Sequence, residues 1–430
     1  MGRRFAYGLC ALLCACGAHN DEDTRLPNDA VLGNDGGSGS TSESSGGGSS
    51  GGAGGTSDAG PSSGNGDAAL PHNVGSCSGL GSTNQWEDIS PAGMILSPPY
   101  TGALVPMVDP QNSGTVYVNT ALSGIFKSID CGATWTKTNT GRNGDQIDMG
   151  QVWSAAIDPV NPQILYVLTG YGPSGLWKST NGGVDWDNVL PTNLGMPGFV
   201  GRVAMDPTNH LHLLLSFHNN CTGGRAPVCF GETKDGGMTW NVLDFPTSLA
   251  SAWGEGMYLL PIDAAHWILE FWDIFYTSDA GSTWTLVTPG GKGAAGSIQG
   301  DYFRTPDGTF YLPAQFGVIS SPDGQNWTMS GSGASGGDGL IGDGIRLFAL
   351  QGFQPPSGSN FAFSAIYTQA TNWSTLATPG LGTLVSGASA MAYDADHGLL
   401  YSAIQANGLY RTVTRSTSSN GGTGLADAGM

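Results

Sequence analysis

The chain has 430 residues and a formal net charge of −19, yet only 11% of its residues are charged. An acidic balance without a basic stripe excludes the surface that binds nucleic acid, so nucleic acid is not an expected partner. The 70 glycines and 12 tryptophans, with so little charge, favour a secreted all-β protein that is rich in turns.

Residues 1–16 have the features of a secretion signal. Two arginines precede an apolar run at residues 5–13 that is too short to span a membrane. The run ends in Ala15-Cys16, which resembles a bacterial lipobox, so Cys16 is the predicted lipidation site; ordinary signal cleavage nearby is the alternative. The residue after Cys16 is Gly17 and not an Asp, which in some bacteria would indicate retention in the inner membrane, so export to the outer membrane is allowed. The expected location is the bacterial cell envelope, as an outer-membrane or surface lipoprotein that touches the membrane only through its lipid anchor.

Residues 17–75 form a segment of Gly, Ser and Asp with almost no apolar side chains. Such a segment cannot bury enough surface to offset its ordering entropy, so it predicts a disordered tether. The C-terminal residues 415–430 are similarly rich in Ser and Gly and are predicted to be a disordered tail. A single folded domain is expected between them, over residues 76–414.

One phrase, Ser-x-Asp-x-Gly-x-Thr-Trp, recurs along this domain. Its copies begin at Ser128, Ser179, Thr233 and Thr277, with a shortened copy at Ser321 and a faint sixth that ends at Trp373. The tryptophans recur roughly every 43–54 residues, the length of one four-stranded propeller blade. Each copy follows short β-branched and aromatic runs bounded by Gly, Pro, Asn and Asp, which predict strands and hairpins. Helices should be few.

The two ends of the domain complement each other. A seventh unit runs from Met391 to Arg411 and stops before the phrase, while a strand that contains Trp86, at residues 84–89, has no unit before it. We expect this N-terminal strand to complete the last unit. The sequence therefore predicts a seven-bladed β-propeller of four-stranded blades, in which closure leaves only short, protected sheet edges.

The repeated phrase resembles the Asp-box, or bacterial neuraminidase repeat, and the resemblance covers most of residues 84–414. This family includes sialidases, xyloglucanase-type glycoside hydrolases, sortilin-type receptors and photosystem assembly factors, so the resemblance is specific for the fold and not for a function.

A structural role is expected for the phrase itself. Its Ser, Thr and Asp side chains can bond turn amides, its glycine can take positive φ, and its tryptophan can pack between sheets. The family resemblance agrees, because Asp-boxes lie on the face away from sialidase-type active sites. The residues assigned to this role are Asp130, Trp135, Asn181, Trp186, Asp235, Trp240, Asp279, Trp284, Asp323 and Trp327.

Four cysteines remain in the domain after the signal and Cys16 are set aside. Cys221 and Cys229 bracket a short loop that a local disulfide would close. Closure of the ring would bring Cys77 and Cys131 to the same end of adjacent blades, where a Cys77–Cys131 disulfide would lock it. Metal binding is the alternative, and it is disfavoured because no His or Cys cluster has metal-ligand spacing along the chain. No metal or other cofactor is expected.

The opposite, open face is formed by the links between blades and by the turns between second and third strands. Its sequence is irregular, so function is expected there. Aromatic rings mixed with carboxylates suit a sugar-binding cleft, although each tryptophan is also explained by packing in an inner strand. The predicted ligand-binding residues are Trp153, Tyr171, Arg202, Trp253, Trp272 and Phe316. The candidate catalytic acids are Asp148, Glu255, Glu270, Asp301 and Asp343.

No catalytic motif is complete. The arginine motif that sialidases carry near the first strand is replaced by Leu104-Val105-Pro106-Met107. Xyloglucanase-type enzymes place two catalytic acids on two tandem propellers, whereas this sequence predicts a single propeller. The sequence therefore predicts a secreted, lipid-anchored, monomeric propeller that binds a glycan or a surface protein. The alternative is a xyloglucanase- or sialidase-like glycoside hydrolase that acts on extracellular polysaccharide through a carboxylate pair, and a third hypothesis is an assembly scaffold.

Overall fold

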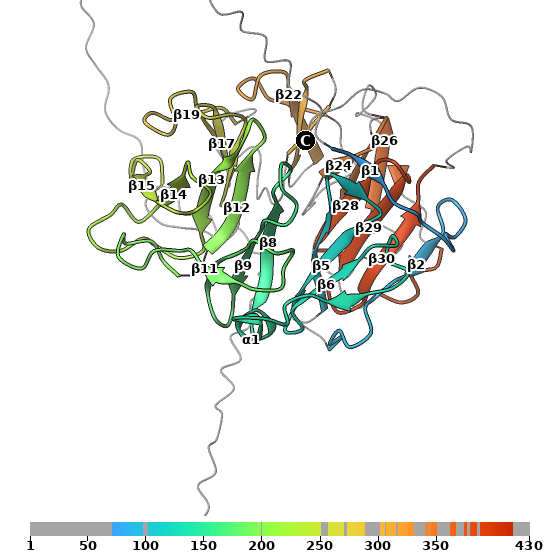
Figure 1. Cartoon of the computed structure of the whole chain (residues 1–430). Helices are drawn as coiled ribbons and strands as arrows, with labels where there is room; N and C mark the ends of the chain where they lie inside the picture. The colour runs from blue at the N-terminus through green and yellow to red at the C-terminus, as the bar shows by residue number, and fades with distance from the viewer. Residues whose placement is uncertain are drawn as a thin grey trace, which may run out of the picture. The chain divides into compact units, whose positions relative to one another are not determined.

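Figure 1 shows the computed structural model of the chain. It describes residues 71–97, 102–198, 200–250, 257–270, 273–288, 302–305, 307–314, 317–330, 340–343, 345–350, 362–366, 374–375, 379–384 and 388–415. The predicted signal with Cys16, most of the tether and residues 416–430 lie outside these ranges. The described part is built of strands, and its helix α1 (Gly144–Asp148) has five residues. No helix there has the length and hydrophobicity needed to cross a membrane.

The strands form antiparallel units of four in chain order. The first two units are joined edge to edge into one eight-stranded sheet, where Ala121 pairs with Gln151, and the other five are separate four-stranded sheets. The first contains β3 (Gly102–Val108), β5 (Val116–Ala121), β6 (Ile125–Ser128) and β7 (Thr136–Lys137). The second contains β8 (Gln151–Ile157), β9 (Leu165–Gly170), β10 (Gly175–Ser179) and β11 (Asp187–Asn188). The third contains β12 (Val200–Asp206), β13 (Asn209–Phe217), β14 (Cys229–Thr233) and β15 (Asn241–Asp244).

The remaining units follow the same order. The fourth contains β16 (Tyr258–Pro261), β17 (Trp267–Glu270), β18 (Ile274–Thr277) and β19 (Thr285–Leu286). The fifth contains β20 (Phe303–Arg304), β21 (Phe310–Ala314), β22 (Gly317–Ser321) and β23 (Thr328–Met329). The sixth contains β24 (Leu340–Gly342), β25 (Arg346–Leu350), β26 (Ala362–Ile366) and β27 (Ser374–Thr375). The expectation of an all-β fold of four-stranded sheets is confirmed.

The last sheet joins the two ends of the domain. Its strands β28 (Ala390–Asp394), β29 (Leu399–Ile404) and β30 (Gly408–Val413) are completed by β2 (Trp86–Asp88), with Trp86 opposite Thr412. Figure 1 shows β2 beside β30. Arg411 strengthens the junction, because its guanidinium binds Glu87 Oε2 at 2.9 Å and donates to the Cys131 carbonyl at 2.6 Å.

The first strands of neighbouring sheets pack against one another. β3 contacts both β8 and β28, β8 contacts β12, β12 contacts β16, and β24 contacts β20 and β28. The core lies between adjacent sheets, where Trp186 packs with Met107 and Val152 from the first two sheets. Its side chain is fully buried, and its Nε1 donates to the Gly183 carbonyl at 2.9 Å.

The segment before β2 differs from the expectation. Residues 71–75, predicted as the end of the tether, include β1 (Asn73–Val74), which pairs in parallel with β4 (Asn112–Ser113). His72 adds a 2.6 Å contact to Asp396, and this hydrogen bond outweighs burial and raises the pKa of His72. These contacts were not predicted from the sequence, because a strand of two residues is too short to show a periodic pattern of apolar side chains.

The repeated phrase forms the same turn between the third and fourth strands of successive sheets. In the third sheet Thr233 Oγ1 donates to Asp235 at 2.7 Å and accepts from the Gly237 amide at 2.9 Å. Asp235 also accepts from the amide of Thr239 at 2.9 Å and from its hydroxyl at 2.5 Å. Gly237 has φ of 90°, a conformation that glycine adopts without strain. The turns at Ser128 and Thr277 repeat this network.

Replacing Asp235 by alanine should destabilise the third sheet by about 1–2 kcal/mol, because several turn donors lose their acceptor. Asp235→Asn is the matched control, since the second sheet carries Asn181 at this position and Asn181 still accepts from the Asp185 amide at 2.9 Å. Urea unfolding of the two variants provides the measurement. The hydrogen bonds from the Thr239 hydroxyl and amide lower the pKa of Asp235 to about 2, so the stability that Asp235→Ala loses relative to wild type should decrease as the pH falls from about 3.9 towards 2. Equal losses in both variants would contradict the role assigned to the carboxylate.

A buried ion cluster stabilises the same sheet. His212 Nδ1 lies 2.7 Å from Asp206 Oδ2, and its Nε2 lies 3.2 Å from Glu232 Oε1. Burial alone would lower the pKa of His212, but the hydrogen bonds to the two carboxylates outweigh it and raise the pKa to about 9.

This cluster predicts a pH dependence of unfolding. Because the pKa of His212 is higher in the folded state, its stabilisation is complete below about pH 6.5 and is lost as the pH rises through about 9. His212→Gln should therefore lower the free energy of unfolding at pH 6 more than at pH 9.5, measured by urea titration at both values. A pH-independent difference between variant and wild type would show that the imidazole is uncharged.

Candidate functional site

The open face of the structure is defined by the starts of the first strands and the turns between second and third strands. In an antiparallel sheet these lie at the end opposite the phrase turns. Arg202 and Tyr258 lie at or near the starts of first strands, while Tyr171 and Glu270 lie at second-to-third-strand turns or next to them. The open face therefore combines residues of the second, third and fourth sheets.

Three rings form a row across the second and third sheets. Trp153 in β8 lies edge-on to Tyr171, with ring centroids 6.1 Å apart, and Tyr171 lies 6.3 Å from the ring of His218, which follows β13. Tyr171 is 50% exposed and holds φ of 47°, so the turn presents its ring to solvent. Exposed aromatic rings offer the flat apolar surface on which sugar rings stack.

A buried acid lies in the fourth sheet. Glu270, at the end of β17, is 0% exposed and is paired in register with Tyr258. The Arg202 guanidinium lies 5.1 Å from the centroid of the Tyr258 ring. Within the described part of the chain, neither carboxyl oxygen of Glu270 has a hydrogen-bond partner. Burial raises the pKa of Glu270 well above its usual range, and the nearby positive charge of Arg202 opposes this only in part.

This arrangement defines the chemistry available at the face. Burial favours the protonated form of this acid, and a protonated carboxyl group can donate its proton to a leaving group. When the proton leaves, the guanidinium of Arg202 stabilises the carboxylate that remains. Glu270 and Arg202 were both predicted as site residues. Tyr258 was not predicted, although it begins the first strand of the fourth sheet, much as Arg202 lies near the start of the first strand of the third.

Asp148 lies at the open face but is held by its neighbours. It is the last residue of α1, and its carboxylate accepts hydrogen bonds from Lys137 Nζ at 2.7 Å and from Asn139 Nδ2 at 2.6 Å. It also lines a cavity of about 360 Å³ together with Ile95 and Trp135. Because an ion pair and an amide already occupy its oxygens, Asp148 orders the link between the first two sheets. No contact within the described residues joins it to Glu270.

Asp343 lies at the other end of its sheet. It follows β24 directly, so it begins the turn between first and second strands, and its carboxylate accepts from the Arg346 amide at 2.6 Å and pairs with the Arg346 guanidinium. This position differs from the predicted open face. An Asp recurs at the same place in other sheets, where it binds amides further along its turn: Asp109, Asp158, Asp206, Asp263 and Asp394. Asp343 belongs to this structural series.

The other predicted site residues lie outside the described residues. These are the candidate acids Glu255 and Asp301 and the predicted ligand-binding residues Trp253, Trp272 and Phe316.

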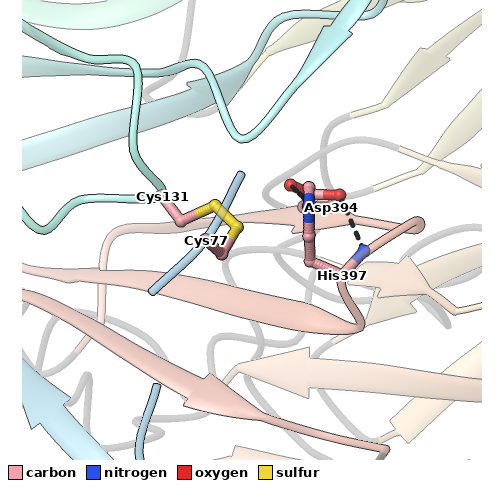
Figure 2. A group of neighbouring side chains, drawn as sticks. All are labelled: Cys77, Cys131, Asp394 and His397. Carbon is pink, nitrogen blue, oxygen red and sulfur yellow. Dashed lines mark hydrogen bonds and ion pairs between the residues drawn. A yellow bond between two sulfur atoms is a disulfide. The ribbon is translucent and has the colours of Figure 1, made fainter. Parts of the chain in front are cut away.

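Both predicted disulfides are present. Cys77–Cys131 joins the segment before β2 to the first phrase turn, with Cα atoms 5.4 Å apart, and Cys221–Cys229 closes a local loop with Cα atoms 6.0 Å apart. Asp394 and His397 lie beside the first disulfide, and the four side chains place one possible ligand atom each within 4.8 Å of one another (Figure 2). Chain spacing did not reveal this group, because its members come from three distant segments.

Two kinds of comparison relate the chain to known proteins. No protein-family model matches it. It is 28% identical over 197 residues, 43% of the chain, to a xyloglucanase of Hypocrea jecorina (strain QM6a), and 28% identical over 208 residues, 45% of the chain, to the xyloglucanase Xgh74A of Acetivibrio thermocellus. The chain spans about a fifth of the length of these curated relatives, since each match covers 20% of the relative.

Solved structures resemble a larger part of the chain. The GH74 enzyme of Niastella koreensis matches with a TM-score of 0.54 and 18% identity, over 78% of this chain and 55% of that one. YCF48 bound to a D1 peptide matches with a TM-score of 0.52 and 15% identity, over 78% of this chain and 99% of that one. The extracellular domain of BT4673 from B. thetaiotaomicron matches with a TM-score of 0.53 and 11% identity, over 77% of this chain and 40% of that one. The chain is a β-propeller. At these identities the propeller likeness shows the fold alone.

Proposed function

We propose that this propeller is a glycoside hydrolase that acts on an extracellular polysaccharide, with Glu270 as the proton donor. The observation that carries the proposal is the fully buried carboxyl group of Glu270, whose pKa is raised by burial, near the positive charge of Arg202 and at the same end of the sheets as the exposed ring of Tyr171. Glycoside hydrolysis needs a carboxylic acid that gives its proton to the leaving group, and burial favours the protonated form of Glu270.

The similarity to xyloglucanases supports a β-glucan as the substrate class. The stretch that is similar to xyloglucanases covers nearly half of the chain, and a glucan backbone with its flat sugar faces suits the row formed by Trp153, Tyr171 and His218. A second carboxyl group is also required. We assign this role to Asp273, which is 5% exposed and directly precedes β18, across the turn from Glu270.

The proposal includes the architecture and the location. The repeated turns are Asp-boxes, and the sheets form a ring of seven blades that β2 closes by pairing with β30. The domain acts outside the cytoplasm, as a monomer on a lipid anchor at Cys16, where polysaccharide is accessible.

A second candidate function is glycan or protein binding without hydrolysis. The observation that favours it is the 0% exposure of Glu270, because substrate reaches this acid only after neighbouring side chains move. The exposed ring of Tyr171 needs no such movement to bind a ligand.

Incubating the full-length protein with a panel of polysaccharides separates the two functions. Xyloglucan, mixed-linkage β-glucan, xylan and a sialylated glycoprotein are tested for binding by affinity electrophoresis and for cleavage by release of reducing ends. The hydrolase proposal predicts new reducing ends from a β-glucan. Binding with no release from any substrate would overturn it in favour of the second function, and Tyr171→Ala should weaken binding in either case.

A further inference from the structure

We propose that the Cys77–Cys131 disulfide is one of two states of a clasp, and that reduction converts it into a zinc site formed by Cys77, Cys131 and His397. In the second state the metal, instead of the disulfide, holds the segment before β2 against the first and last sheets. Zinc favours thiolate and imidazole ligands in a tetrahedral arrangement.

The site is assembled from three parts of the chain. Cys77 lies in the segment between β1 and β2, Cys131 lies in the phrase turn of the first sheet, and His397 lies in the turn between β28 and β29. Their ligand atoms, with one oxygen of Asp394, lie within 4.8 Å of one another. Ligand atoms of a tetrahedral zinc ion lie about 3.3–3.8 Å apart. Small side-chain movements therefore suffice once the sulfur–sulfur bond is broken.

The surroundings hold the ligands in place. Cys131 is fully buried, and its amide donates to the Gly114 carbonyl at 2.8 Å, while the Gly114 amide donates to Asp394 Oδ2 at 2.8 Å. Asp394 Oδ2 also lies 2.8 Å from His397 Nδ1, as Figure 2 shows. A carboxylate that receives the second ring nitrogen of a ligating histidine is the usual partner in zinc sites. Asp394 therefore orients His397, and water completes the coordination.

Opening the disulfide also frees the nitrogen that would bind the metal. In the oxidised state His397 Nε2 lies 2.9 Å from the carbonyl of Gly75. Gly75 precedes Cys77 by two positions on the same segment, so release of Cys77 allows the carbonyl to move away. The reaction is balanced: a dithiol reductant supplies two electrons and two protons and becomes a disulfide, and zinc binding then displaces the two thiol protons and the proton through which His397 Nε2 contacts the Gly75 carbonyl.

The chain contains internal controls. Within the described residues, Cys221–Cys229 gathers no His or carboxylate into a comparable group. The pairs His210–Asp158 and His266–Asp263 repeat the His–Asp contact in other sheets without cysteines beside it. Only beside Cys77–Cys131, among the described residues, do a disulfide and a His–Asp contact occur together.

Cobalt titration tests the proposal. The full-length protein is reduced and titrated with Co²⁺, with Cys77→Ser/Cys131→Ser as the blank. We expect one cobalt per chain, with thiolate charge-transfer and tetrahedral d–d absorption that zinc displaces and reoxidation removes. His397→Gln and Asp394→Asn should each weaken binding by about 10–100-fold. The Cys221→Ser/Cys229→Ser variant should bind like the wild type.

Several results would overturn the proposal. The reduced protein could show no thiolate charge-transfer band. The band could be unchanged in both His397→Gln and Asp394→Asn, which would indicate that the dithiol alone binds cobalt. Circular dichroism could show that reduction unfolds the domain and that zinc does not restore it. Each variant is first checked in its oxidised state by the same measurement.

Discussion

Glu270→Gln is expected to reduce hydrolysis of the polysaccharide substrate by a factor of about 10³ or more, while the fold is retained. The amide is nearly isosteric with the protonated acid, but it has no proton of suitable pKa to give to the leaving group. Reducing-end release under initial-rate conditions measures the loss. Binding by affinity electrophoresis should remain, because the rings of Trp153, Tyr171 and His218 are unchanged.

Asp148→Asn is the matched control for this experiment. Asp148 is a carboxylate at the same face, but its oxygens are held by Lys137 and Asn139, so its removal should leave the rate within a few-fold of wild type. The reverse result, in which Asp148→Asn abolishes hydrolysis and Glu270→Gln does not, would transfer the catalytic role to the link between the first two sheets.

Glu270→Gln should also change how the stability of the protein depends on pH. Burial raises the pKa of Glu270 in the folded state, so the folded protein binds more protons than the unfolded one above the ordinary glutamate pKa. Stability is therefore lost as the pH rises from about 4.3 through the raised pKa. Glu270→Gln removes this loss, and its free energy of unfolding relative to wild type should increase between pH 4 and pH 7.

Removal of the Cys77–Cys131 disulfide is expected to cost more stability than removal of Cys221–Cys229. The first spans 54 positions and the second 8, and the entropy lost by the unfolded chain grows with the closed loop. The chain-entropy model gives about 4 kcal/mol for the longer loop and about 2–3 kcal/mol for the shorter one. Guanidinium unfolding of the two double Cys→Ser variants, in metal-free buffer, provides the comparison.

The order of the two losses is the informative result. If Cys221→Ser/Cys229→Ser loses as much stability as Cys77→Ser/Cys131→Ser, the longer disulfide does not constrain the junction between the ends. The ion pair of Arg411 with Glu87 and the pairing of Trp86 with Thr412 would then hold the junction without it.

Local patterns predicted the parts of this molecule that depend on local chemistry. The phrase that contains Asp235 predicted its turn because its acceptors and donors lie within a few residues. The bracketing of a short loop by Cys221 and Cys229 predicted their disulfide for the same reason. Asp343 was misplaced because the sixth sheet has weak strand signals, so the start of its first turn could not be located.

The pairing of β2 with β30 and the Cys77–Cys131 disulfide were predicted from the complementary ends of the domain, but other features that depend on packing between distant segments were not. Glu270 follows Trp267, Ile268 and Leu269 on a strand that is buried on both faces, and nothing in that run shows whether its last residue is covered. The group around His397 required the ring junction to be known first. Its members are far apart in the sequence, and only the fold brings their possible ligand atoms within 4.8 Å of one another.

The pairing of β2 with β30 has a consequence for the synthesis of the protein. The ion pair that accompanies it joins Arg411 to Glu87, 324 positions apart. During synthesis β2 has no sheet to join until nearly the whole chain has been made, and the last sheet keeps an open edge until β2 pairs with β30. A chain that stops before Gly408 leaves β2 without a partner strand and leaves β29 paired with β28 alone. A change that removes either β2 or β30 therefore leaves the other strand with an unpaired edge.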